Sequence, residues 1–458
     1  MDAHRARRRD ARLGEVRRAL SPGSIPERET GRGSEVREEE SGSAPHPTRR
    51  RFLIGAAGAA GLAGAGVFGV PVLLPRWLGP GPFRPLASLS DAARELVEIA
   101  FEGVDRARIL DVHVHLVGLE TDLDGCSVSE RMRSPWHPIE RLRFSTYLRA
   151  AGVGDAEHPD AAYVERLLTL QRDANPEGRL LLLAFDEAFD PSGRPRPERT
   201  AFHTPDAYAL ALAREHPEFR AAASVHPYRA DALERLDAAA RAGAVAIKWL
   251  PNAMGIDPAS ARLDPYYERM AELGLVLLTH TGEERAVGDV HDQALGNPLR
   301  LRRALAAGVR TIAAHCASLG EDADLDRGGA RGPSFDLFLR MLEEEREHGR
   351  LFGGISAVTQ VNRPARVLAE LLRRQDLHER LVNGSDYPLP AIDPLVSTRQ
   401  LVHREFLDPA ERDPLNEIYR ANPLLFDFVL KRRLRLVEGG RTLRFAPSVF
   451  ESARIFPS

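Results

Sequence analysis

Four histidines and one aspartate stand where short apolar runs of strand length come to an end. His113 and His115 close the first of these runs, His280 and His315 close two later ones, and Asp386 follows the last. Because alternate residues of a strand face the same side, His113 and His115 point in one direction. Imidazole and carboxylate are the ligands that a borderline divalent ion such as zinc prefers. The five residues therefore predict a metal site.

Eight apolar runs alternate with amphipathic stretches from about residue 90 onwards. Strands that are buried on both faces read as near-continuous apolar runs, as these do. Strict alternation of strand and helix favours a parallel sheet, and eight repeats favour an α/β fold closed as a (β/α)8 TIM barrel with the metal site at its C-terminal face. The expected strands are 109–116, 180–185, 221–226, 244–250, 275–281, 311–316, 351–358 and 381–385, and the clearest helical patterns are 231–241, 295–307, 335–348 and 363–374.

Lysine is rare in this chain, which makes the position of Lys248 informative. Of the 63 Lys+Arg residues, only Lys248 and Lys431 are lysine, and Lys248 closes the fourth apolar run. We interpret this as a position that needs a primary amine able to lose its charge, or a slimmer side chain than arginine. A contact with an anionic substrate and a structural role are both open.

Composition excludes several classes of protein. Hydrophobic residues make up 43% of the 458 residues and charged residues 28%, with a formal net charge of -3, so we expect a soluble globular domain and no nucleic-acid partner. Two cysteines, Cys126 and Cys316, cannot form a disulfide scaffold or a cysteine-rich zinc module. A single bridge between them stays open for an exported protein.

The pattern of the N-terminal residues indicates a targeting region. Residues 1–47 are poor in aromatic and β-branched residues and predict a disordered segment. Residues 48–75 begin with Thr48-Arg49-Arg50-Arg51-Phe52-Leu53 and continue uncharged to Leu74, which resembles a twin-arginine signal. We expect export by the twin-arginine machinery, to the periplasm or to a membrane anchor facing outward, with the membrane contacted only through this segment.

The rest of the chain divides into three parts. Residues 76–108 are read as a linker and leading helix, 109–403 as the barrel and 404–458 as a helical tail. The tail should contain at least one helix, around 416–433, with Lys431 in the basic end that caps it. Within the barrel, the long connections 117–160, 186–203 and 317–333 should lie at the C-terminal face, and the first could form a lid with Trp136 and His137, or be surface elaboration.

The histidine and aspartate set resembles the amidohydrolase superfamily, in particular its amidohydrolase-related branch of hydrolases and decarboxylases, such as the aminocarboxymuconate-semialdehyde type. The resemblance covers about residues 109–430. It implies a metal held by His113, His115, His280 and Asp386, with zinc favoured over manganese or iron. The matching segments are Val112-His113-Val114-His115, Leu278-Thr279-His280-Thr281-Gly282, Asn297-Pro298-Leu299-Arg300 through Ala314-His315, and Gly384-Ser385-Asp386-Tyr387-Pro388.

The resemblance leaves the number of metal ions open. In binuclear members a strand-four lysine is carboxylated and bridges two metals, a role that Lys248 could take with His280 and His315 on the second metal. In mononuclear members His280 joins the first metal, and His315 is an acid/base beside it.

The implied chemistry is hydrolysis of an amide, ester or lactone bond of a small molecule. A bound metal lowers the pKa of water from 15.7 to about 7, Asp386 would carry the proton, and His315 or Lys248 would steady the oxyanion. A metal-dependent decarboxylase or hydratase and a non-catalytic exported metal-binding protein are the alternatives, and the protein could be a homo-oligomer. Asp111, Thr279 and Ser385 would orient the ligands, and His226, Trp249, Arg285 and Arg229 are weaker candidates for substrate contacts.

Overall fold

The computed structural model describes residues 84–119, 125–154, 156–287 and 292–457. The expected disordered segment 1–47 and twin-arginine segment 48–75 lie outside the described residues. Among the helices that are described, none has both the length and the apolar character needed to cross a membrane.

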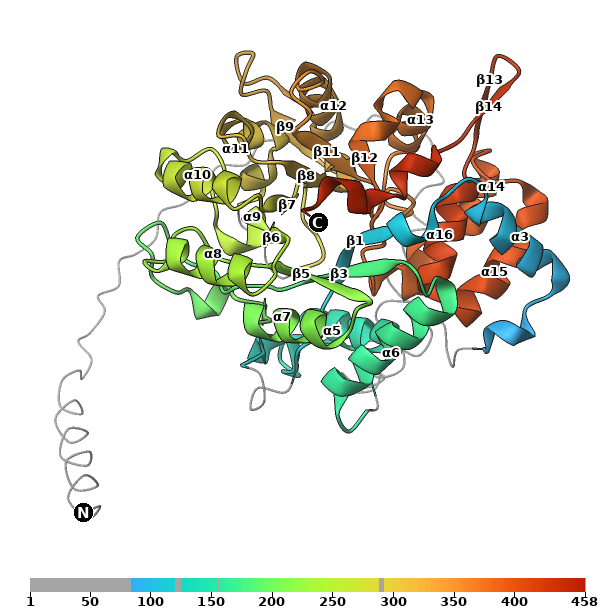
Figure 1. Cartoon of the computed structure of the whole chain (residues 1–458), viewed down its shortest axis with the longest axis horizontal. Helices are drawn as coiled ribbons and strands as arrows, with labels where there is room; N and C mark the ends of the chain where they lie inside the picture. Colours follow the sequence, from blue (N-terminus) through green and yellow to red (C-terminus); the bar gives the residue numbers. More distant parts are fainter. Residues whose placement is uncertain (1–83, 120–124, 155, 288–291, 458) are drawn as a thin grey trace, which may run out of the picture. The chain divides into compact units, whose positions relative to one another are not determined.

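Eight parallel strands form one sheet whose order around the molecule follows the chain, and helices surround it (Figure 1). The sheet closes where Val114 of the first strand pairs in parallel with Tyr387, beyond the last strand. The closure confirms the predicted (β/α)8 barrel. The strands are β1 (Leu110–His115), β3 (Arg179–Leu183), β5 (Phe219–Ala223), β6 (Ala246–Trp249), β7 (Val276–His280), β8 (Thr311–Ala314), β11 (Leu351–Gly354) and β12 (Leu381–Val382).

The helices pack an apolar face against this barrel. In α13, for example, the buried residues Val367, Leu368, Leu371 and Leu372 recur at the spacing of one helical face. The helices are α3 (Asp91–Phe101), α5 (Pro138–Ala151), α6 (Pro159–Ala174), α7 (Asp206–Glu215), α8 (Ala232–Arg241), α9 (Pro251–Met254), α10 (Asp264–Glu272), α11 (Arg302–Ala306), α12 (Ser334–Glu344), α13 (Ala365–Arg373), α14 (Thr398–His403), α15 (Arg412–Ala421) and α16 (Pro423–Arg433). Two short antiparallel hairpins join β9 (Glu321–Ala323) to β10 (Arg331–Pro333) and β13 (Leu436–Glu438) to β14 (Arg441–Leu443). A third antiparallel pair joins β2 (Ser127–Val128) to β4 (Phe202–His203), which is distant in the chain.

Several expected strands end earlier than their apolar runs. The backbone turns into the left-handed region at His315, where φ is 61°, and at Asp386, where φ is 65°. An extended strand cannot continue through such a residue. The turn ends β8 before His315, while β12 ends after Val382, so both functional side chains sit on the rim just beyond a strand.

Two expected helices are interrupted by proline. The stretch 416–433 is two helices, α15 and α16, because Pro423 has no N–H to continue the first, and Asn422 caps the second by accepting from Leu425 N. The stretch 295–307 breaks in the same way at Asn297 and Pro298. Each stretch is therefore helical, as expected, but is divided into two or more segments.

The C-terminal segment closes the floor of the barrel. Ile455 and Phe456 are buried in the core cluster that contains Val276, at the start of β7, and Leu110, at the start of β1. The guanidinium of Arg310 donates to the carbonyl of Ile455 at 2.7 Å. In Figure 1 this red segment lies across the centre of the ring of strands. The apolar plug therefore fills the end opposite the histidines.

Candidate metal centre

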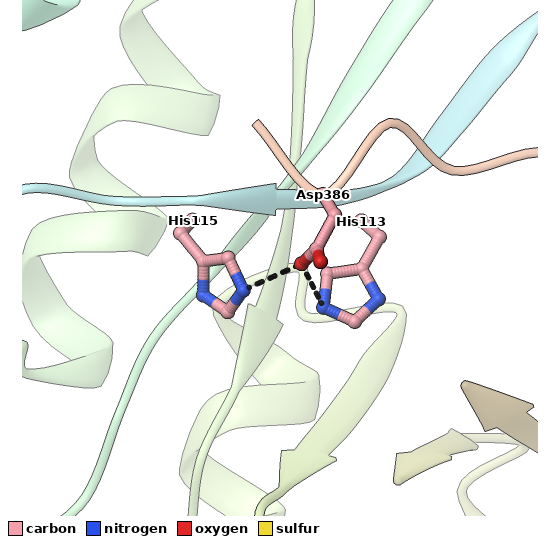
Figure 2. Close-up of side chains that lie close together, drawn as sticks. All are labelled: His113, His115 and Asp386. Atoms are coloured by element: carbon pink, nitrogen blue, oxygen red, sulfur yellow. Dashed lines mark hydrogen bonds and ion pairs between the residues drawn. The ribbon is translucent and has the colours of Figure 1, made fainter. Parts of the chain in front are cut away.

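His113, His115 and Asp386 form a compact group at the C-terminal ends of the strands. Nε2 of His113 lies 3.3 Å from Oδ1 of Asp386, and Nε2 of His115 lies 3.1 Å from the same oxygen. Figure 2 shows the two imidazoles turned toward the one carboxylate. One ligand atom from each side chain falls within 4.8 Å of the others, so this group could hold a metal ion.

The backbone around Gly384 brings the two halves of the group together. The N–H of Asp386 donates to the carbonyl of His113 at 2.8 Å. The carboxylate of Asp111 accepts from the N–H groups of His113 (3.0 Å) and Ser385 (2.8 Å). A Cβ at Gly384 would lie 2.7 Å from the Cβ of His113, so a side chain there would push the two segments apart. Asp111 and Ser385 thus orient the group through its backbone.

His280 adds a third imidazole whose free nitrogen is buried. Its Nδ1 lies 3.2 Å from Oε2 of Glu284, so we place the proton on Nδ1. Its Nε2 is buried without a hydrogen-bond partner among the described residues. A carboxylate that fixes the tautomer of a histidine from behind is the usual support for a metal ligand. The donor set therefore fits a divalent ion.

Ser356 links His315 to the same group. Nδ1 of His315 lies 2.9 Å from the Ser356 hydroxyl and 3.3 Å from its carbonyl oxygen. The same hydroxyl lies 3.5 Å from Nδ1 of His113. The ring centre of His315 lies 5.0 Å from the ring centre of His113 and 5.0 Å from that of His280. His315 therefore belongs to the site, and its Nε2 is the ring atom left for the cavity.

Lys248 reaches the centre from β6. It is 2% exposed, and its Nζ lies 3.3 Å from Nε2 of His113. Burial lowers its pKa to about 8, against the opposing pull of Asp386 and Glu284. At pH 7 the amine is therefore still mostly charged, with about a tenth of it neutral, a far larger neutral fraction than in an exposed lysine.

The protonation states of the group suit metal binding. Burial holds the pKa of the imidazoles of His113 and His315 well below the ordinary value, which keeps both rings neutral. Burial would raise the pKa of Asp386, but the attraction of its charge to any proton on His315 or His113, together with the hydrogen bond from His115, holds that pKa well below its usual range. Neutral imidazole and ionised carboxylate are the forms that bind metals.

The second lysine buttresses the Gly384 turn from behind. Lys431 is fully buried on α16, and its Nζ donates to the carbonyl of Gly384 at 2.7 Å and to Oδ2 of Asp427 at 2.6 Å. It also donates to Oδ1 of Asn383 at 3.5 Å. The expectation that Lys431 simply caps its helix is corrected, because the side chain turns inward to carbonyls of the turn after β12.

A cavity of about 220 Å³ opens above this group. Its walls include Arg285, which is largely exposed and paired with Glu283, and the buried Arg363. Of the residues singled out in the sequence, those lining it are His113, His115, Lys248, His280, Arg285, His315 and Asp386.

Other candidates lie away from this cavity. The imidazole of His226 is engaged at Nε2 by the carbonyl of Met254 (3.0 Å) and at Nδ1 by the N–H of Tyr228 (3.2 Å). Trp249 is buried and donates to the carbonyl of Val225. Trp136, His137, Thr279 and Arg229 also do not line the cavity. No disulfide bridge joins Cys126 and Cys316.

Three residues of the site carried too weak a sequence signal to be found. Glu284 stands four residues after His280, Ser356 follows β11 closely, and Arg363 begins the stretch that was read only as a helix. Each lies in a loop after a strand of the barrel, and that position was the available clue.

A comparison with known proteins supports the resemblance inferred from the sequence. A family model described as amidohydrolase matches residues 110–424 of the chain. No curated protein sequence matches.

Solved structures with a related fold are distant in sequence. A TIM-barrel protein from Bordetella bronchiseptica is 13% identical, with 61% of this chain and 86% of that chain covered and a TM-score of 0.40. The 5-carboxyvanillate decarboxylase from Sphingomonas paucimobilis is 12% identical, with 76% and 99% covered and a TM-score of 0.42. A candidate 2-pyrone-4,6-dicarboxylic acid hydrolase from Pseudomonas putida is 17% identical, with 70% and 97% covered and a TM-score of 0.38.

Proposed function

This chain belongs to the amidohydrolase family, and on that premise we propose that it is a metal-dependent hydrolase of an amide, ester or lactone bond in a small molecule. The observation that carries the proposal is the convergence of His113, His115 and Asp386 on one point at the floor of a cavity, with the orphaned Nε2 of His280 beside them.

The residues that would hold the metal are His113, His115, Asp386 and His280. Three nitrogens and one carboxylate oxygen suit zinc, with manganese or iron as alternatives. When bound, such an ion polarises a carbonyl and activates water at neutral pH. We propose one metal ion per chain, because the compact group contains three ligands and His280 supplies the fourth.

The protein's own groups have distinct places around the substrate. Asp386 is ionised at neutral pH, so its carboxylate can accept a proton from the attacking water and return it to the leaving group. Lys248 and Nε2 of His315 face the cavity, where they can donate to or steady the oxygen on which charge develops. Glu284 and Ser356 hold the rings of His280 and His315 in the orientation that this needs.

Non-oxidative decarboxylation is the second candidate on the same scaffold. It is favoured by two buried cationic side chains, Lys248 and Arg363, in the cavity wall, because a decarboxylase must accept a substrate that carries a carboxylate. Product identification separates the two, since a decarboxylase releases carbon dioxide and a hydrolase releases a cleaved or ring-opened product.

The experiment compares the wild-type protein with His113→Ala and Asp386→Asn. Metal content is measured by plasma mass spectrometry, and turnover is measured on panels of esters, amides, lactones and aromatic carboxylates. Both variants should lose metal and turnover while keeping the circular dichroism of the folded protein. His348→Ala, an exposed histidine away from the cavity, is the matched control and should change neither. Full turnover in either site variant would refute the proposal.

A further inference from the structure

A second, apolar cavity adjoins the metal cavity. It measures about 110 Å³, and its walls include Val117, Phe144, Leu183 and Phe202, from the segments after β1 and around β3 and β4. His115, Tyr147, Phe185 and Val287 line both cavities. We call this second cavity the apolar chamber. A group placed in it lies next to the ring of His115, one of the residues of the metal centre.

The chamber is of a size and polarity that suit a compact apolar group. An apolar cavity of about 150 Å³ in a protein core stays dry and accepts benzene. The chamber, which shares wall residues with the metal cavity, suits one aromatic ring or a branched alkyl group. Burial of such a group yields about 25 cal/mol for each Å² of apolar surface removed from water.

Arg363 contributes an unpaired charge on another side of the cavity. It lies in the loop between β11 and α13, and its side chain is 8% exposed. Among the described residues, no side chain forms an ion pair with its guanidinium, and its Nε is buried without a hydrogen-bond partner. Arg285, in the same cavity, differs because it is exposed and bound by both carboxylate oxygens of Glu283.

A buried guanidinium without an anion is unfavourable. Burial lowers the pKa of Arg363, but an arginine stays charged in proteins, so the charge needs a partner. The carboxylates of Asp386 and Glu284 favour the charged form from a distance without contacting it. A planar carboxylate is the partner that a guanidinium binds best, through two parallel hydrogen bonds.

We propose that Arg363 and the apolar chamber together select the substrate, which is a small carboxylate bearing one compact apolar group. Its carboxylate pairs with Arg363, its apolar group enters the chamber, and its reacting bond lies between them beside His115 and Asp386. This rests on the function proposed above, since it names the substrate class of that same site.

The test measures binding, with benzoate and benzamide as matched probes of equal shape. Calorimetric titration of the full chain should show that benzoate binds about 10- to 100-fold more tightly than benzamide, the range of a charged hydrogen-bonded pair. Arg363→Met should abolish this preference, and Arg285→Met should keep it. Equal binding of both probes by the wild-type protein overturns the proposal, as does a preference that survives in Arg363→Met or is lost in Lys248→Met instead.

The chamber is tested by filling it. Val117→Phe places a ring among the chamber walls and should weaken benzoate by about tenfold or more while acetate, which lacks the apolar group, binds as before. An unchanged affinity for benzoate removes the chamber from the proposal.

Each titration is repeated on metal-free protein, because a carboxylate can also bind a metal ion. If the protein takes up metal but shows no preference that depends on Arg363, the substrate class is wrong and the proposed function stands. If no metal binds but Arg363 still selects benzoate, the anion site stands and the proposed function fails.

Discussion

Nε2 of His113 lies 3.3 Å from the amino group of Lys248 and 3.3 Å from the carboxylate of Asp386. One imidazole nitrogen is therefore shared between a cationic and an anionic side chain. A metal at that nitrogen would compete with the amine for the same lone pair. The lowered pKa of Lys248, about 8, reduces this competition because the neutral amine repels a metal less than the charged one.

The number of metal ions follows from this arrangement. We expect about one metal ion per chain, and Lys248→Met should retain it, because the proposed ligands do not include the amine. Plasma mass spectrometry gives the metal content, and intact mass shows whether Lys248 carries an added carbon dioxide. Two metals per chain, lost together in Lys248→Met, would instead establish the carboxylated bridge.

Glu284 should matter through His280 rather than by touching the substrate. Glu284→Gln removes the charge that fixes Nδ1–H of His280, so the metal affinity should fall about 10- to 100-fold. Glu283→Gln is the matched control, since Glu283 pairs with Arg285 and should leave the affinity unchanged. Competition with a chelator of known affinity measures both. Equal losses in the two variants would contradict this role.

The buried pair of Lys431 and Asp427 should support the metal centre from behind. Lys431→Met leaves the carboxylate of Asp427 buried without its partner, which costs about 3–5 kcal/mol of unfolding free energy. It also frees the carbonyl of Gly384, so metal affinity should decrease too. The double variant Lys431→Met/Asp427→Asn should recover part of the stability in urea titrations. If the double variant recovers no stability, the loss of unfolding free energy comes from packing and not from the unpaired carboxylate of Asp427.

The plug at the barrel floor should contribute strongly to stability and not to chemistry. Phe456→Ala removes a buried ring from the floor cluster and should lower the unfolding free energy by about 3–5 kcal/mol. Val437→Ala, on an exposed hairpin, should change it by no more than about 0.5 kcal/mol. Metal content should stay at the wild-type level in both. A loss of metal from the folded Phe456→Ala protein would show that the two ends of the barrel are coupled.

His226 should make stability depend on pH. Burial lowers its pKa to about 4, against about 6.5 in the unfolded chain, so between these values the unfolded chain binds a proton that the folded chain does not. The contribution of His226 to the free energy of unfolding is therefore highest above about pH 6.5. It falls by up to about 3 kcal/mol as the pH is lowered to 4. Urea titrations at several pH values should show a flatter dependence for His226→Gln. Parallel curves for the two proteins would refute the assignment.

The barrel could be predicted because its signal is repeated. Each strand is a short apolar run that is buried on both faces, and eight such runs leave few alternative folds. The ends of the elements were less predictable. At His315 the apolar pattern continues into Cys316 and Ala317 while the backbone turns into the left-handed region, and β12 stops at Val382, three residues before its expected end.

The histidines and the aspartate of the centre could be found because strand ends converge in a barrel. Arg363 could not, because its pattern is also that of an ordinary helix start, and its importance comes from the absence of a partner among the described residues. His226 shows the opposite case. It follows a strand as the metal histidines do, but main-chain groups at Met254 and Tyr228 occupy its ring, and a sequence does not reveal such contacts.

The burial of both lysines gives the protein a built-in reporter of its own opening. Lys248 and Lys431 are the only lysine side chains in the chain, and both are almost completely enclosed. A lysine-specific protease should therefore act on the folded barrel only as fast as the barrel opens, and an amine-directed label should reach Lys431 only in the same way. The rate of cleavage, or of labelling at Lys431, would then measure local unfolding around the site without an engineered probe.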